Sequence, residues 1–336
     1  MPSVAIVVLN WNGFEDTEKC INSLLFQTHN DFSIVVVDNG SIDESLVKLK
    51  RLEMTYDKLT VIANRTNKGF AGGVNTGIKY ALEKGFDSVA LFNNDAIADK
   101  DWLLNLDKEM GRDDVSVVTG LLLSRDGKKI DSTSEQYSVW GMPFPRSRGI
   151  STAHAPASGF VFGATGGATL YDSGLFKEIG LFDESFFAYY EDVDISFRTQ
   201  LAGHKVYFTN QAIAYHKQGA TSSKIPGFTV YQTFKNIPLL YAKNVPVGLL
   251  LPIGARLLLL YVLFFGNAVK NGVGIPALKG WFASVRYFWT RSIWLRSTIQ
   301  RNKKVSTSYI NSIIFHDLSP VQTRMRKFRK LFTGKT

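Results

Sequence analysis

The stretch VAIVVLNWNG, residues 4–13, passes from a run of β-branched and aliphatic residues directly into a polar turn. Three further strand-like runs follow at 33–37, 59–63 and 88–92. Helix-length amphipathic patterns separate the runs at 15–27, 42–54 and 72–84. Strands that alternate with helices predict βαβ units, and therefore an α/β fold with a doubly wound, mostly parallel sheet and flanking helices.

Polar residues follow the end of each of the four runs. They occupy 10–13, 38–43, 64–77 and 93–95. Because open α/β sheets bind ligands beyond the carboxyl ends of their strands, the four segments together predict one binding site at one edge of the sheet. Asn, Asp, Ser and Gly also favour turns and helix caps, so each segment taken alone keeps that simpler interpretation.

The third polar segment contains NKGFAGGVNTG at 67–77, which opens a predicted helix with glycines and Lys68. Glycine lets a backbone approach a ligand closely, and a helix N-terminus attracts phosphate. The spacing matches neither the Walker A pattern nor GxGxxG, so neither a P-loop NTPase nor a dinucleotide-binding dehydrogenase is supported. Asp38, at the end of the second run, is placed to accept hydrogen bonds from a base or a ribose hydroxyl, or else to cap a helix.

Asn93, Asn94 and Asp95 follow the fourth run. A carboxylate at this position suits a divalent cation that bridges two phosphates, and hard oxygen ligands favour Mg²⁺ or Mn²⁺. His216 follows a later strand-like run, where a neutral imidazole would complete the coordination of the metal. A single histidine is more often structural, and that alternative stays open.

Residues 186–198, FFAYYEDVDISFR, place three acids within four positions at the start of a predicted helix. Such a concentration of negative charge raises the proton affinity of a carboxylate, so one of Glu191, Asp192 and Asp194 is a candidate base for an acceptor hydroxyl. The alternative is ordinary enrichment of acids in the first turn of a helix, which the helix dipole favours.

The middle of the chain, 115–179, has a less regular pattern. A strand is predicted over 115–123 and a hairpin at 124–127, followed by a long loop that reaches about residue 158. Loops of that length are usually lids or binding loops. A strand of small residues is predicted over 163–170, and a helix over 172–179.

Charge divides the chain at about residue 230. Residues 1–230 carry 22 Lys and Arg against 28 Asp and Glu, a balance of −6, whereas residues 231–336 carry 17 against one, a balance of +16. An acidic half joined to a basic, apolar half favours anionic phospholipid over nucleic acid as a partner, although a solvated basic face has the same composition. We therefore predict a catalytic domain over 1–230 and a helical, membrane-associating region over 231–336.

The apolar stretch 245–266 is long enough to cross a bilayer, but Arg256 near its middle argues against a simple span. Beyond it, aromatic residues alternate with cations over 279–296, as in helices that lie at a bilayer interface. We expect peripheral or monotopic docking, and a span, a re-entrant hairpin and an ordinary soluble bundle remain alternatives. A single cysteine and the absence of a signal-peptide pattern at the first residues favour the cytoplasmic face of the membrane.

Several motifs together resemble the family 2 glycosyltransferases, and in particular their rhamnosyltransferase-like branch. They are VVLNWNG at 7–13, VVDNGSID at 36–43, NKGFAGGVNTG at 67–77, LFNNDA at 91–96, TGGATL at 165–170, GLFDESFFAYYEDVDISFR at 180–198 and YHKQGATSS at 215–223. The resemblance implies a GT-A fold and an inverting single displacement. It departs from the family at Asn93, which stands where the metal motif Asp-x-Asp has its first acid.

The resemblance also implies roles for single residues. Asp192 is the expected base, Asp95 and His216 the expected metal ligands, and Asp38 the expected partner of the nucleotide base. The residues expected around the donor are Asn10, Asn12, Asp38, Asn39, Ser41, Asn67, Gly69, Asn75, Asn94, Gly166, Gly167 and Glu191.

The expected activity is transfer of a hexose from a nucleotide-diphosphate sugar to a lipid-linked glycan. dTDP-rhamnose is the favoured donor, with UDP- and GDP-sugars left open. A nucleotidyltransferase is the nearest enzymatic alternative, but residues 10–16 lack the basic residues that a triphosphate loop needs. A non-catalytic membrane scaffold is the alternative of another kind.

Overall fold

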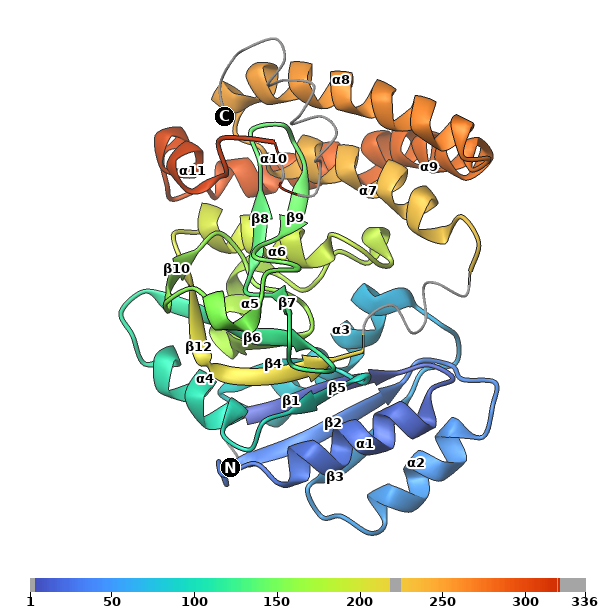
Figure 1. Cartoon of the computed structure of the whole chain (residues 1–336), viewed down its shortest axis with the longest axis vertical. Helices are drawn as coiled ribbons and strands as arrows, with labels where there is room; N and C mark the ends of the chain where they lie inside the picture. Colours follow the sequence, from blue (N-terminus) through green and yellow to red (C-terminus); the bar gives the residue numbers. More distant parts are fainter. Residues whose placement is uncertain (1–3, 218–224, 319, 321–336) are drawn as a thin grey trace.

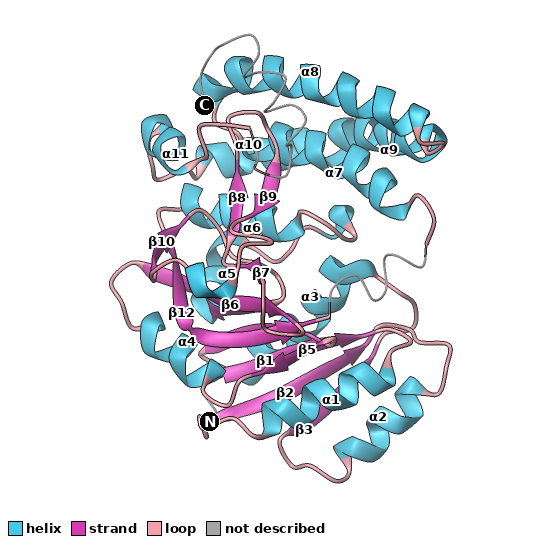
Figure 2. Ribbon diagram, viewed as in Figure 1, coloured by secondary structure: helices cyan, strands magenta, loops and turns pink. Residues whose placement is uncertain are grey.

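The computed structural model describes residues 4–217, 225–318 and 320 of the 336-residue chain. The last part of the YHKQGATSS motif and residues 321–336 of the basic C-terminal region lie outside the described residues. Figures 1 and 2 show a sheet with helices on its faces and a separate layer of helices at one end of the molecule.

The predicted alternation forms the first half of the sheet. Its strands are β1 (Val4–Asn10), β2 (Phe32–Asp38), β3 (Leu59–Ala63) and β4 (Ser88–Asn93), all parallel in the order β4-β1-β2-β3. The helices between them are α1 (Phe14–Leu25), α2 (Ser45–Glu53) and α3 (Gly69–Lys84). Alternate residues of β1 face opposite layers, since Ile6 packs among residues of α1 and α2 whereas Val7 packs among residues of α3.

The second half of the sheet is mixed. Strand β11 (Ala168–Asp172) pairs antiparallel with both β4 and β6 (Val115–Ser124), and β12 (Lys205–His216) pairs parallel with β6. Three short strands pair antiparallel at the edges, namely β5 (Ala96–Ala98), β7 (Ile130–Ser132) and β10 (Gly159–Val161). Helix α4 (Trp102–Met110) packs beside β6 and β12.

The structure differs from three of the predicted elements. Helix α3 begins at Gly69 rather than at residue 72, so it includes the glycines predicted to precede it. The predicted long loop holds β7, the hairpin strands β8 (Glu135–Tyr137) and β9 (Pro143–Pro145), and a 3₁₀ turn at Thr152–His154. The predicted strand of small residues starts only at Ala168. The predicted helix that follows it is α5 (Ser173–Ile179).

Helix α6 (Glu191–Leu201) starts at the predicted acidic cluster, just after a 3₁₀ turn at Glu184–Phe186. Beyond the sheet come α7 (Phe228–Asn244), α8 (Val247–Lys270), α9 (Gly274–Tyr287), a π-helical turn at Phe288–Ser292, α10 (Ile293–Arg301) and α11 (Thr307–Ile313). These form the layer at the end remote from α1 and α2 (Figure 1). Among the helices of the described residues, α8 alone is long and apolar enough to cross a membrane, with a mean hydropathy of 2.2.

Candidate active site

The ends of β1 and β2 meet through Asp38 and Asn10, which are register partners in the sheet. Asn10 Nδ2 donates to Asp38 Oδ1 at 2.8 Å, and the backbone N–H and hydroxyl of Ser41 donate to the same carboxylate at 3.1 and 2.6 Å. The Ser41 hydroxyl also accepts from the backbone N–H of Asn12 at 2.9 Å. Four of the residues predicted around the donor therefore brace one another, and Asp38 is 1% exposed.

A second group of predicted residues lies at the N-terminus of α3. Asn39 Nδ2 donates to Asn67 Oδ1 and to the carbonyl of Gly69, both at 3.0 Å. Its Oδ1 accepts from Asn64 and from the backbone of Lys68 at 3.1 and 3.2 Å. All the hydrogen-bonding groups of the Asn39 amide thus have protein partners, and the amide fixes the loop rather than projecting from it.

Asn75 corrects the predicted donor set. It is buried within α3, its Nδ2 donates to the carbonyl of Phe182 at 2.9 Å and to Glu184 at 3.1 Å, and its Oδ1 accepts from the backbone of Phe182 at 3.0 Å. Both N–H groups of the amide are engaged in tying α3 to the segment before α6, so Asn75 is a structural residue rather than the predicted donor contact.

The glycines of α3 serve packing rather than close approach to a ligand. A Cβ on Gly73 would lie 2.4 Å from Leu9, and one on Gly77 would lie 2.5 Å from Val7. Both distances are shorter than the contacts that a Cβ atom makes in proteins, so α3 approaches β1 this closely only because these positions lack side chains. Lys68 precedes the helix at its N-cap position.

Asp95 and His216 converge at the end of the central strands. Oδ1 of Asp95 lies 3.0 Å from Nε2 of His216, and Nδ1 of the same ring lies 2.7 Å from Oδ2 of Asp131. Burial lowers the pKa of the ring, but the hydrogen bonds and negative charges of the two carboxylates outweigh burial and raise the pKa of His216 to about 9. Asn93 is adjacent, with its Nδ2 3.3 Å from His216 Nε2, and Asn94 donates to Thr17 at 2.9 Å.

These residues fit a divalent cation held by few protein ligands. The Asp95 oxygen and the His216 nitrogen lie 3.0 Å apart, close enough that both would hold the same cation. Asp131 holds the other ring nitrogen, as a carboxylate behind a ligating histidine commonly does. Within 4–217 and 225–318 no group of three or more His, Cys, Asp and Glu side chains is arranged to hold a metal. Two protein ligands suit Mg²⁺ or Mn²⁺ completed by substrate phosphates better than a closed structural site.

Gly166 and Gly167 connect the residues around Asp95 to the acids of α6. The backbone N–H of Gly166 donates to Asp192 Oδ2 at 3.2 Å, and the carbonyl of Gly167 accepts from the backbone of Asn93 at 3.0 Å. A Cβ on Gly167 would lie 2.8 Å from the Asn93 side chain. Two adjacent residues thus touch the two halves of the predicted site.

The three acids of α6 have different surroundings. Asp194 is 0% exposed and contacts Arg198 at 3.0 Å, Lys243 at 2.7 Å and Asn244 at 2.7 Å, so it is a structural counterion. Asp192 is the only one of the three that is not buried. Partial burial of the Asp192 carboxyl raises its pKa, although hydrogen bonds from the N–H groups of Gly166 and Val193 oppose the rise.

Glu191 is a buried acid whose carboxyl group is only partly satisfied. It is 7% exposed, and its Oε2 has no hydrogen-bond partner among the described residues. Burial, followed by the charge of Asp192, raises the pKa of Glu191 to about 8. At neutral pH this side chain is therefore mainly protonated and uncharged.

Two further acids lie near the site, both in the segment predicted as a long loop and neither among the predicted site residues. Asp131 on β7 holds His216 and pairs with Arg148 at 2.9 Å. Glu135 on β8 is 8% exposed, and burial together with the charge of Asp192 raises the pKa of its carboxyl well above the usual range. No periodicity or motif in this segment marked either residue.

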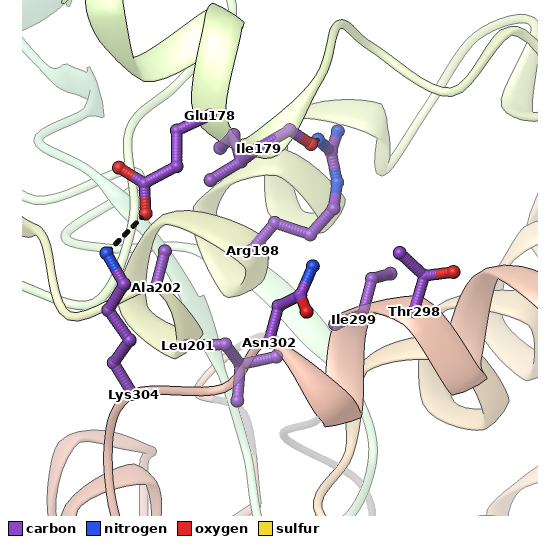
Figure 3. A pocket seen from close by; sticks show the side chains of 9 residues that line it. All are labelled: Glu178, Ile179, Arg198, Leu201, Ala202, Thr298, Ile299, Asn302 and Lys304. Carbon is purple, nitrogen blue, oxygen red and sulfur yellow. Dashed lines mark hydrogen bonds and ion pairs between the residues drawn. The ribbon is translucent and has the colours of Figure 1, made fainter.

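A cavity of about 450 Å³ lies elsewhere, between α5, α6 and α10. Figure 3 shows its walls, with Glu178 and Lys304 joined by an ion pair at 2.7 Å. The Arg198 guanidinium in its wall is engaged by Asp194 and by the carbonyls of residues 179–181. The cavity marks the seam between the sheet domain and the helical layer and holds none of the predicted site residues.

Comparison with known proteins identifies the family. The sequence pattern of "Glycosyl transferase family 2" matches residues 3–180, more than half of the chain. The low-salt glycan biosynthesis hexosyltransferase Agl10 of Haloferax volcanii is 26% identical over 242 residues, which are 70% of this chain and 74% of Agl10. The dTDP-rhamnosyl transferase RfbF of Shigella flexneri is 26% identical over 238 residues, 67% of this chain and 76% of RfbF.

Two solved structures share the fold at low sequence identity. The mannosyltransferase PcManGT from Pyrobaculum calidifontis, in complex with GDP-Man and Mn²⁺, is 16% identical with a TM-score of 0.50, over 93% of this chain and 79% of that one. GalNAc-T7 with UDP, GalNAc and Mn²⁺ is 16% identical with a TM-score of 0.57, over 72% of this chain and 48% of that one. The predicted α/β GT-A fold is thereby confirmed. The chain belongs to glycosyltransferase family 2, and it is a hexosyltransferase with a GT-A fold.

Proposed function

We propose that this hexosyltransferase transfers its sugar with inversion from a nucleotide-diphosphate hexose, favouring dTDP-rhamnose, to a hydroxyl of a lipid-linked glycan. The observation that carries the proposal is the contact of adjacent residues Gly166 and Gly167 with Asp192 and Asn93. This contact puts a carboxylate suited to act as a base beside the strand end where the diphosphate would lie. A single displacement needs both groups and no enzyme nucleophile.

Asp192 is the proposed base. Its Oδ2 accepts a weak hydrogen bond from Gly166, and the carboxylate is the least buried of the three acids on α6. A raised pKa makes the carboxylate a better proton acceptor. Asp192 would take the proton of the acceptor hydroxyl as that oxygen attacks the anomeric carbon. Asp194 is excluded because Arg198 and Lys243 already neutralise it.

Asp95 and His216 are the proposed metal ligands, and Asp131 would keep the Nε2 lone pair of His216 directed at the metal. A bound Mg²⁺ or Mn²⁺ would supply positive charge to the departing diphosphate. Asn93 replaces a family carboxylate and contributes an uncharged amide, so fewer negative charges surround the cation here than in an Asp-x-Asp motif.

The donor and acceptor are proposed from relatives. RfbF is named a dTDP-rhamnosyl transferase, which supports dTDP-rhamnose. WfgD of Escherichia coli, 29% identical over 102 residues, is named for UDP-Glc and a GlcNAc-diphosphoundecaprenol acceptor. That second name supports a lipid-linked acceptor and keeps UDP-sugars open.

The placement of α8 supports docking at the membrane surface rather than a span. One face of the helix, with Ile253, Leu257 and Leu260, is buried against the rest of the layer. The opposite face is apolar and exposed, with Leu251 at 83%. Arg256, whose charge is unfavourable in a span, is exposed and donates to the carbonyl of Val139 at 3.3 Å, so its guanidinium reaches back to the protein. A helix packed along its length in this way is suited to lie in the plane of an anionic membrane.

A donor screen tests the proposal. The full-length protein is incubated with Mn²⁺ and dTDP-rhamnose, or with UDP- and GDP-hexoses, and release of nucleoside diphosphate is measured with and without membrane lipid extract. We expect release from dTDP-rhamnose that the extract stimulates. Pyrophosphate release from a nucleoside triphosphate and a sugar phosphate would indicate a nucleotidyltransferase instead. No release from any sugar nucleotide, despite intact folding, would contradict catalysis and favour the scaffold.

A further inference from the structure

The turn that precedes α6 has an unusual backbone. Phe187 has φ 61° and ψ −61°, and the backbone N–H of Ala188 donates to the carbonyl of Phe186 at 2.7 Å, which closes a γ-turn of the rare positive-φ kind. Tyr189 and Tyr190 follow, each with φ 71°. Three residues with side chains in this region cost free energy, so the turn persists only where its surroundings hold it.

Asn236 of α7 holds this turn from one side. Its side chain is 0% exposed, and its Nδ2 lies 3.0 Å from the carbonyl oxygen of Phe186, 2.9 Å from that of Ala188 and 2.8 Å from that of Tyr189. The neighbouring Lys235 Nζ donates to the Phe186 carbonyl at 3.1 Å. A single amide thus lies within hydrogen-bond distance of three main-chain carbonyls of the turn, those of Phe186, Ala188 and Tyr189.

Helix α3 holds the turn from the other side. The carbonyl of Phe187 accepts from the backbone of Ala71 at 3.2 Å. A Cβ on Gly69 would lie 2.3 Å from that carbonyl oxygen, so only glycine permits the contact. The turn is therefore clamped between the N-terminus of α3 and the buried face of α7.

The turn determines where α6 begins. Tyr190 is the N-cap of α6 in a left-handed conformation, and its carbonyl accepts from the backbone of Asp194 in the first turn of the helix. Asp192 lies in that first turn, two residues after Tyr190. A change in the conformation of Tyr190 would therefore move Asp192 relative to Gly166.

We propose that Asn236 is a positioning residue for the base, acting through the turn 187–190 that fixes the first turn of α6. The proposal rests on the proposed role of Asp192. Only the donor half of the amide is used, since Asn236 Oδ1 has no partner among the described residues. An apolar residue would leave the carbonyls of Phe186, Ala188 and Tyr189 without this donor, and a carboxylate would repel them.

Hydrogen exchange of the full chain tests the clamp without any substrate. In Asn236→Ala, the backbone amides of residues 187–194 should exchange at least tenfold faster than in the wild type. Phe234→Leu is the matched control, because Phe234 lies on the same helix but packs toward α8 and α9. It should leave the exchange of 187–194 unchanged. If alanine prevents folding, Asn236→Ser supplies a smaller donor for the same measurement.

Turnover provides the second measurement, with whichever of dTDP-, UDP- and GDP-hexoses the wild type cleaves fastest. Asn236→Ala should lower kcat by about 10–100-fold, as expected for a displaced catalytic group, while KM for the donor stays within about twofold. Exchange and kcat that match those of Phe234→Leu would overturn the proposal. Asp192→Asn separates the two ideas, because normal turnover in that variant contradicts the base itself, whereas the exchange data still decide whether Asn236 holds the turn.

Discussion

Nδ1 of His216 lies 2.7 Å from Oδ2 of Asp131, which is itself buried to 1% exposure. The opposite ring nitrogen faces Asp95. Asp131 thus fixes the orientation of the imidazole, and Asp95 lies beside the ring nitrogen that would bind a cation. We therefore predict that Asp131 influences metal affinity through the proposed ligand His216, without contacting the metal itself.

Asp131→Asn should weaken binding of Mn²⁺ by about 10–100-fold, the usual cost of removing a partner behind a ligating histidine. Asparagine keeps the shape of the aspartate side chain but lacks the negative charge that strengthens the imidazole as a metal ligand. Titration of free Mn²⁺ by electron paramagnetic resonance, with dTDP present, measures the affinity. Asp126→Asn in the nearby exposed hairpin is the control, because Asp126 contacts Ser124 and not His216. Equal affinities for the two variants would contradict the assignment.

Metal affinity should also depend on pH. The pKa of His216 is raised to about 9, so at neutral pH the metal-free ring is protonated and a cation must displace that proton. Affinity for Mn²⁺ should therefore rise with pH, by about tenfold per unit between pH 7 and 9, and level off above the pKa. Calorimetry in buffers of different ionisation enthalpy would report one proton released per metal at pH 7. If the affinity for Mn²⁺ does not change over this range, the cation does not displace a proton from His216.

Asp192→Asn should lower kcat by about 10²–10⁴-fold and leave binding of the donor within about twofold, because the lost step is proton removal from the acceptor. Diphosphate release gives kcat, and calorimetry with the nucleoside diphosphate gives the affinity. In the wild type, kcat should fall as the pH drops through the raised pKa of Asp192, since the protonated carboxyl accepts no proton. A variant with near-normal turnover would exclude Asp192 as the base.

The parallel half of the sheet could be predicted from the sequence because strands buried on both faces are continuous apolar runs. Every residue of β1 is buried or nearly so, and the strand ends at Asn10, the first polar residue after the apolar run. The order of motifs along the chain then pointed to the family. The positions of Asp95 and His216 followed from the same rule, since both stand at strand ends.

Other parts of the site left no such pattern. The sequence cannot distinguish the Asn75 amide, which binds the backbone of Phe182, from an amide that binds a nucleotide. Asp131 lies on a strand of three residues, too short for any periodicity. The partners of Asn236 are main-chain carbonyls about 50 residues away. The order of side chains in the sequence does not indicate which main-chain groups lie near Asn236 in the fold.

The exposed apolar side chains of the C-terminal helical layer should bind anionic vesicles. Trp289 and Trp294 are each 71% exposed and stand on the same layer as Leu251. Each large apolar side chain that leaves water contributes about 1.5–3 kcal/mol, so Trp289→Ser with Trp294→Ser should weaken binding to phosphatidylglycerol vesicles at least tenfold. Co-sedimentation measures binding. Met54→Asp is the control, because Met54 is 82% exposed but follows α2, far from this layer in Figure 1.

Salt and lipid composition distinguish docking from a span. The cations of the layer should each contribute about 1 kcal/mol near an anionic surface, so binding should weaken in high salt and on phosphatidylcholine alone. If the protein only docks, high salt should release it from the vesicles, and the double tryptophan variant should not stay bound. A protein that only detergent extracts, whatever the salt and whatever the residues at 289 and 294, would show that α8 separates from the layer and crosses the bilayer.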